Sequence, residues 1–182
     1  MGYPFFLRTG LGSAKHYWKN TCFVPDAQSI ARHIYEIIEW SEFVSLIGLP
    51  YSIWAVRKFI PFVSTFPAFH GLPVNRERRY FIENGRVLCH HPYWPEAAIE
   101  GHTAEANWKG KLAEINHEPA DEISFLSSLA AKVSMAFEDA WSVDFALAQD
   151  GQWYAIDMAL MRVSFHWPEC PNHPEALQEI SP

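Results

Sequence analysis

The sequence predicts an α+β fold in which antiparallel hairpins are combined with a few amphipathic helices. Two observations carry this prediction. Strand-like runs flank the turn signals Asn84-Gly85 and Asp150-Gly151, and apolar residues recur at helical spacing in two other segments. A third observation, the lack of a repeated strand–helix rhythm, argues against a doubly wound parallel sheet.

The N-terminal third of the chain predicts two strands and one helix. Residues 5–9 form an apolar run typical of a short strand, and residues 10–15 are expected to be a flexible loop. Asp26 follows Pro25 and is expected to cap a helix. The apolar residues of that helix recur at helical spacing and are expected in the core: Ile30, Ile34, Ile37 and Ile38. A second strand is expected over residues 54–60.

The rest of the chain predicts two hairpins and one helix. Residues 76–83 and 86–90 are expected to pair around Asn84-Gly85, and residues 142–157 to form a hairpin around Asp150-Gly151. Residues 96–119 have weak periodicity and are expected to be mostly loop. Asp121 is expected to cap a helix with an apolar face made of Ile123, Leu126, Leu129, Ala130, Val133 and Phe137.

Composition limits the class of protein. The chain has 182 residues, of which 49% are hydrophobic and 15% aromatic, so it can build a packed core in one domain or in two small lobes. A formal net charge of −7 argues against a protein that binds DNA through overall positive charge. Because the cysteines number 3, and no signal peptide or membrane-length apolar run is seen, we expect a cytoplasmic protein that does not bind membranes.

The second hairpin carries the most informative charge pattern. If Asp150 and Gly151 are the two central residues of the turn, Gln149 pairs with Gln152 and Asp144 faces Asp157 on one side of the sheet. Like charges that face each other destabilise a sheet, so a bound cation, a basic side chain or a raised pKa must offset them. Mg²⁺ held by two carboxylates and substrate phosphates is one solution. The alternative is a pair of surface aspartates, or a different turn that breaks the pairing.

Basic residues mark two further segments. Arg8 closes an apolar strand and is followed by small and basic residues: Thr9, Gly10, Gly12, Ser13 and Lys15. Such a loop lets backbone N–H groups approach a phosphate, although it lacks the Walker order; the alternative is an ordinary solvated loop. In the first hairpin, a two-residue turn predicts that Arg79 faces His90 and shares a side with Glu77.

Three segments, in this order, resemble the ATP-grasp superfamily: residues 5–18, 75–87 and 143–157. The likeness is to a divergent clade that has an arginine, here Arg8, at the usual strand lysine. The resemblance implies an α+β fold with two small lobes, residues 1–60 and 61–182, whose antiparallel sheets enclose a nucleotide cleft. It also implies ATP and Mg²⁺ as cofactors.

The resemblance assigns roles to particular residues. Arg8 and Lys15 match phosphate-binding positions, and Lys15 is also expected to act in catalysis. Residues 56–60 resemble the strand whose backbone meets adenine, which makes Arg57, Lys58 and Phe59 nucleotide-binding candidates. Arg79 matches the catalytic arginine that reaches the transferred phosphate or the acyl group. Asp144 and Asp157 match the acidic Mg²⁺ ligands.

The implied function is an ATP-dependent ligase that activates a small-molecule or peptide carboxylate as an acyl phosphate, for attack by an amine or a similar nucleophile. The sequence departs from the family at Ala159, where most members have an asparagine ligand. It also starts at the phosphate strand, so we expect the usual preceding domain in a longer protein, a partner subunit in its place, or neither. These departures support an alternative, a non-catalytic nucleotide-binding module that depends on a partner.

A zinc protein is the remaining alternative. His166, Cys170 and His173 have the spacing H-x₃-C-x₂-H, and Cys89, His90 and His91 lie in the first hairpin. Imidazole and thiolate ligands at such spacing suit Zn²⁺. Packing or surface roles are the simpler explanation for the same residues.

Overall fold

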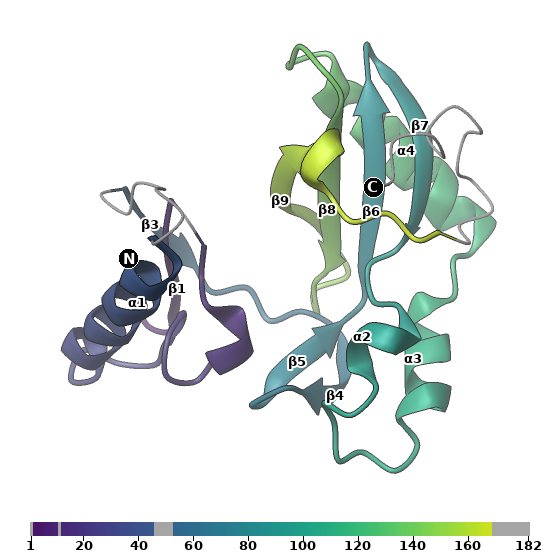
Figure 1. The fold of residues 1–182 in the computed structure, drawn as a ribbon. Helices are drawn as coiled ribbons and strands as arrows, with labels where there is room; N and C mark the ends of the chain where they lie inside the picture. The colour runs from purple at the N-terminus through teal and green to yellow at the C-terminus, as the bar shows by residue number, and fades with distance from the viewer. Residues whose placement is uncertain (1, 11, 46–52, 169–182) are drawn as a thin grey trace. The chain divides into compact units, whose positions relative to one another are not determined.

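A computed structural model describes residues 2–10, 12–45 and 53–168 of the chain. These residues form helices and antiparallel sheets, so the predicted α+β class is confirmed (Figure 1). Contacts divide the chain into two compact units. Unit 1 consists of Met1–Pro61, Phe66–Val74 and Gly101–Glu105, and unit 2 of the remaining residues. The expected lobe boundary after residue 60 concerns nucleotide-binding lobes and stays a prediction.

Unit 1 contains a three-stranded antiparallel sheet of order β2-β1-β3. Its elements are β1 (Phe5–Thr9), β2 (Phe23–Val24), α1 (Ile30–Ser45) and β3 (Trp54–Lys58), with a 3-10 turn at Lys15–Tyr17. Phe5 and Leu7 alternate with less buried positions along β1 and pack with Val24 against Ile37 of α1. The strand predicted over residues 5–9 and the apolar face of the helix are therefore confirmed.

Asp26 caps the turn that leads into α1. Its Oδ1 accepts a hydrogen bond from the Ser29 backbone N–H at 2.9 Å, and α1 begins at the next residue, Ile30. A side-chain oxygen that accepts an otherwise unpaired N–H at a helix start stabilises the helix. The predicted capping role of Asp26 agrees with this contact.

Unit 2 is built on a four-stranded antiparallel sheet of order β7-β6-β8-β9. The strands are β6 (Glu77–Glu83), β7 (Arg86–Pro92), β8 (Trp141–Leu147) and β9 (Trp153–Leu160). The helices are α2 (Glu96–Ile99), α3 (Trp108–Asn116) and α4 (Ala120–Ser134), and a 3-10 turn follows at Met161–Val163. The helix α4 packs on one face of the sheet, where Leu126 and Ala130 meet Tyr80 and Val143 in the core (Figure 1).

The expected helix face is only partly buried. Leu126 and Ala130 are fully buried, and Leu129 and Val133 are packed against the same core, whereas Phe137 lies beyond α4 and is 45% exposed. The capping prediction for Asp121 was wrong. The helix starts at Ala120 after Pro119, so Asp121 lies in its first turn, where a carboxylate still favours the helix dipole.

Two predictions about the remaining segments were wrong. Residues 96–119 contain α2 and α3 instead of a loop, because α3 buries only Leu112 and Ile115 and so shows little periodicity. The two-stranded sheet of β4 (Ser64–Ala68) and β5 (Leu72–Asn75) was not predicted. Each of its strands contains a proline, which in a sequence argues against a strand. No helix among the described residues is long and apolar enough to cross a bilayer.

The first hairpin has the predicted turn but a different register. Asn84 and Gly85 have φ of 48° and 76°, as a type I′ turn requires, and Glu83 pairs with Arg86. A bulge between Phe81 and Ile82 then shifts the pairing by one residue. Arg79 therefore faces His91 and not His90, which corrects the prediction.

The second hairpin reaches the predicted pairing by a different route. The strand β8 ends at Leu147, which pairs with Trp153, so the loop is longer than the predicted two-residue turn. A bulge between Asp144 and Phe145 then shifts the register back by one residue, and Asp144 faces Asp157. The prediction of the turn was wrong, and the predicted pair of aspartates is confirmed.

Candidate functional site

Three of the predicted site residues lie together on one face of the sheet in unit 2. Arg79 of β6 pairs in register with Asp144 of β8, which pairs with Asp157 of β9. Residues that pair directly across antiparallel strands point to the same side of the sheet. We call this side the site face; it is the side opposite α4, because Tyr80 and Val143, the neighbours of Arg79 and Asp144 along their strands, pack on α4.

Asp144 and Arg79 form a bidentate ion pair. Arg79 Nε donates to Asp144 Oδ1 and Nη2 donates to Oδ2, each at 2.8 Å. The side chains of Arg79 and Asp144 are 13% and 6% exposed, so the pair is largely shielded from water. Of the three ways to offset the charge of Asp144 that the sequence left open, the structure shows a basic side chain.

Two further contacts surround the Arg79 guanidinium. Nη1 donates to the backbone carbonyl of Phe165 at 3.0 Å, and the guanidinium carbon lies 4.8 Å from the centre of the Tyr93 ring. Burial opposes the charge of Arg79, but the hydrogen bonds and charge of Asp144 outweigh it and raise the pKa of the guanidinium. Arg79 therefore stays charged at any pH at which the protein is folded.

Asp157 has a different environment from its partner. Its side chain is exposed, and its Oδ1 accepts a hydrogen bond from the Met158 N–H at 3.1 Å. The position of the expected asparagine, Ala159, lies opposite Ser142 of β8 and carries no oxygen in its side chain. The site face thus offers one buried and one exposed carboxylate.

The predicted phosphate-binding residues belong to unit 1. Arg8 of β1 lies opposite Ala55 of β3, and Phe6 lies opposite Arg57, so Arg8 and Arg57 point to the same side of the sheet. Because Phe5 and Leu7 point to α1, this side is the one that α1 leaves uncovered. The structure thus brings Arg8 and Arg57 to one face.

The loop after β1 is more constrained than expected. Thr9 N–H donates to Gly12 O at 3.0 Å, and Gly10 N–H donates to Ile53 O at 2.8 Å. These two N–H groups are therefore used within the protein and are not offered to an anion. Lys15 begins the 3-10 turn that follows Ala14, which has a φ of 49°.

The expected adenine-binding strand is an edge strand among the described residues. The sheet order β2-β1-β3 leaves one long edge of β3 outside the sheet, and Arg57 and Lys58 are exposed on that strand. Phe59 packs instead in an aromatic cluster, with ring centres 5.1 Å from Phe23 and 5.9 Å from Trp18. Its side chain therefore stabilises unit 1.

The zinc alternative finds no support in the described part of the chain, where no group of three or more His, Cys, Asp or Glu side chains is placed to hold a metal ion. Cys89 Sγ and His166 Nε2 form a hydrogen bond of 3.0 Å, and His166 also contacts the rings of Phe81 and His91. Cys170 and His173 lie outside the described residues.

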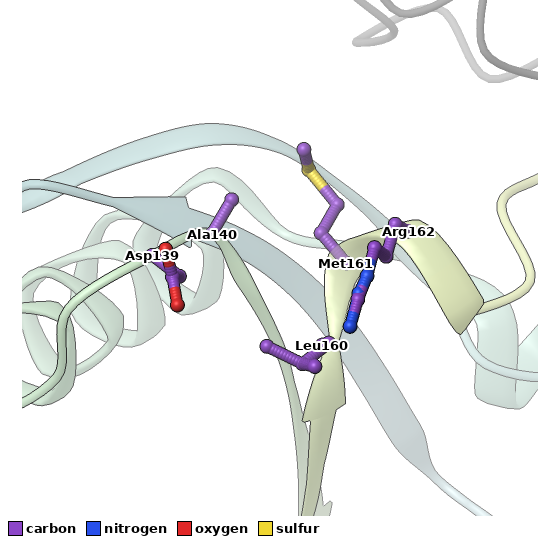
Figure 2. A pocket seen from close by; sticks show the side chains of 5 residues that line it. All are labelled: Asp139, Ala140, Leu160, Met161 and Arg162. Atoms are coloured by element: carbon purple, nitrogen blue, oxygen red, sulfur yellow. The ribbon is translucent and has the colours of Figure 1, made fainter.

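A separate pocket of about 320 Å³ lies where β8 begins and β9 ends. Figure 2 shows Asp139 and Arg162 on opposite sides of the hollow. None of the predicted site residues lines it; the lining residues are Asp139, Ala140, Leu160, Met161 and Arg162.

Two features of the site face were not predicted. One is Tyr93, which follows β7 and packs on Arg79. The other is the segment Ser164–Trp167, which crosses the sheet. Neither has a local sequence signal, because both depend on contacts between residues far apart in the chain.

The model of an ATP-grasp domain family, the third family of its clade, matches residues 1–179. The chain belongs to the ATP-grasp family. This match confirms the resemblance to a divergent ATP-grasp clade and the ATP-grasp fold. No curated protein sequence matches the chain.

Solved structures of ATP-grasp enzymes resemble the chain distantly. One is the biotin carboxylase domain of the Hydrogenobacter thermophilus 2-oxoglutarate carboxylase (15% identity, TM-score 0.49, 87% of this chain and 31% of that one). Another is the D-alanine–D-alanine ligase of Bacillus anthracis, in complex with ATP (17% identity, TM-score 0.47, 88% and 42%). The chain therefore spans less than half of the length of each of these proteins.

Proposed function

We propose that the chain is an ATP-dependent ligase of the ATP-grasp type, which activates a carboxylate as an acyl phosphate for attack by an amine or a similar nucleophile. The observation that carries the proposal is the site face, where Arg79 and two facing aspartates share one side of a sheet in a chain of this family. The carboxylate substrate is a small molecule or a peptide. A preceding domain or a partner subunit would help to bind it.

The donor set of Asp144 and Asp157 fits Mg²⁺. Both are carboxylates, the hard oxygen ligands that Mg²⁺ prefers, and a site with one or two carboxylates leaves room for substrate phosphates. The two hydrogen bonds from Arg79 use only part of the acceptor capacity of Asp144, because a carboxylate has about four lone-pair sites. Bound Mg²⁺ would neutralise charge on the triphosphate.

The residues of unit 1 would hold the nucleotide. Arg8 and Lys15 would bind phosphate oxygens through charge-assisted hydrogen bonds. The open edge of β3 supports the proposal that backbone groups near Arg57, Lys58 and Phe59 meet adenine, because an unpaired strand edge presents both donors and acceptors.

Arg79 is the proposed catalytic residue. Asp144 and Phe165 use three of the five N–H donors of its guanidinium, so two N–H groups are not engaged in these bonds. A guanidinium fixed in this way stabilises negative charge that develops on a phosphoryl or acyl oxygen without a cost for reorganisation. Lys15 would add a second positive charge.

A nucleotide-binding module without chemistry is the second candidate. Two observations favour it: both oxygens of Asp144 are bound to Arg79, and Ala159 replaces an amide ligand. ATP binding without turnover in any substrate mixture, measured by calorimetry, would support this candidate over the ligase.

The first test is ADP release with Mg²⁺, ATP and a pool of carboxylates and amines. We expect release from the wild type, and a rate reduced about a hundredfold in Asp157→Asn, because one carboxylate and its charge are lost. Asp150→Asn is the matched control, since Asp150 lies in the loop of the same hairpin. Equal ADP release from Asp157→Asn and the wild type would contradict the proposal.

A further inference from the structure

The segment Ser164–Trp167, which we call the strap, crosses the site face from β8 over β6 to β7 (Figure 1). Ser164 Oγ lies 2.7 Å from Ser142 Oγ of β8. The carbonyl of Phe165 accepts from Arg79 of β6, and His166 contacts Cys89 of β7. Four consecutive residues thus each contact the sheet, because the Trp167 ring also stacks on the ring of His91.

The orientation of Phe165 separates two explanations of the strap. If the strap only covered apolar surface, its phenylalanine would be expected to point inward. Instead the Phe165 side chain is 56% exposed, and the backbone carbonyl is directed at Arg79. The anchors on both sides, Ser164 and His166, therefore hold a carbonyl acceptor beside a guanidinium.

Tyr93 completes the surroundings of Arg79. Its ring lies against the guanidinium at 4.8 Å, and its backbone N–H donates to Glu77 O at 3.1 Å, which fixes Tyr93 to β6 itself. An aromatic ring face attracts a cation and restricts the planes in which a guanidinium rests. Asp144, Phe165 O and Tyr93 thus contact Arg79 from three elements that are far apart in the sequence.

We propose that Tyr93 and the strap are positioning elements that act through Arg79: they fix its guanidinium on the site face so that it meets its substrate in one orientation. They do not touch the substrate in this proposal. The inference rests on the proposed function in so far as Arg79 has a catalytic role. Its structural half, the fixing of Arg79, holds in the protein without ligand.

The first experiment measures hydrogen exchange of the Arg79 Nε–H in the ligand-free chain, by NMR with ¹⁵N-labelled arginine. We expect exchange about tenfold faster in Tyr93→Leu than in the wild type, because the guanidinium gains rotamer freedom. Tyr93→Phe keeps the ring and should exchange at the wild-type rate. The double variant Ser164→Ala/Trp167→Leu, which loosens the strap, should exchange faster as well.

The matched control is Val163→Ala, since Val163 is 73% exposed and precedes the strap. Wild-type exchange in a folded Tyr93→Leu would overturn the role of Tyr93, and wild-type exchange in the folded strap variant would overturn the role of the strap. If Tyr93→Leu does not fold, a Tyr93→Phe variant with faster exchange would overturn the ring's role, and the strap variant decides the rest.

The second experiment is the ADP-release assay. Tyr93→Leu is expected to lower kcat about tenfold and to change the KM for ATP by less than about threefold, because orientation and not ground-state binding is lost. Tyr93→Phe should restore kcat. An effect on KM alone would overturn the positioning role. If the wild type releases no ADP, the proposed function fails, while the exchange rates still decide whether Arg79 is held in place.

Discussion

Asp144 illustrates at the scale of one residue why a buried carboxylate needs a defined partner. Its side chain is 6% exposed, and the cost of shielding its charge from water is offset by two hydrogen bonds from Arg79. The neighbouring Asp157 is exposed and needs no such partner. The sequence predicted the pair but could not distinguish its members, since burial depends on the strap and the other strands.

His91 carries the pH-dependent prediction at the residue scale. Burial lowers its pKa from 6.5 to about 3, and it faces Arg79 in the sheet. The unfolded chain binds a proton at His91 below about pH 6.5, and the folded chain does not until about pH 3, so stability rises with pH across this window. Acidification from pH 7 to pH 5 should therefore cost up to about 2 kcal/mol through His91.

The measurement is urea unfolding at both pH values for the wild type and His91→Phe. Phenylalanine keeps a ring for the stack on Trp167 and removes the titrating group. The wild type should lose more free energy of unfolding than the variant on acidification. Equal losses in the two proteins would show that His91 is not the group responsible.

At the scale of elements, one buried arginine connects the sheet to the helices on its other face. Arg78 of β6 is fully buried; its Nε donates to Glu122 of α4 at 2.7 Å, and its other nitrogens donate to Ile115 O and His117 O at the end of α3. Burial lowers the pKa of Arg78, although Glu122 and Glu118 oppose this. Arg78 thus joins β6, α3 and α4 beside the site residue Arg79.

Removal of this connection should destabilise the whole sheet. Arg78→Met leaves Glu122 without its partner at 9% exposure and is expected to cost about 3–5 kcal/mol of unfolding free energy. The double variant Arg78→Met/Glu122→Leu should recover part of that loss. Arg86→Met, at an exposed position of β7, is the control and should change stability little. Denaturant titrations measure all four proteins, and additive losses would contradict the coupling.

The hairpins show how far elements follow from local sequence. Asn84-Gly85 predicted its turn correctly because both residues tolerate the positive φ that the turn requires. The bulges beyond the turns were not predictable, since an extra residue in a strand depends on how neighbouring strands and α4 pack. For this reason the sequence paired Arg79 with His90, whereas the structure pairs it with His91.

At the scale of the whole molecule, ligand binding should be visible as stability. A ligand that binds only the folded chain stabilises it by about 2.7 kcal/mol at a hundred times its Kd. We expect ATP with Mg²⁺ to raise the unfolding free energy by about this amount, and ATP with EDTA to raise it less. Asp157→Asn should remove the difference between the two conditions. A Mg²⁺-independent effect in the wild type would contradict the assignment of metal ligands.

The sequence by itself determined the α+β class, the strand over residues 5–9, the turn at Asn84-Gly85 and membership of the ATP-grasp family, because these depend on local patterns and on motifs in a fixed order. Tertiary structure alone decided that Arg79 neutralises Asp144, and that Tyr93 and Phe165 surround it. These contacts join residues as many as 86 positions apart, and only packing of the folded chain brings them together.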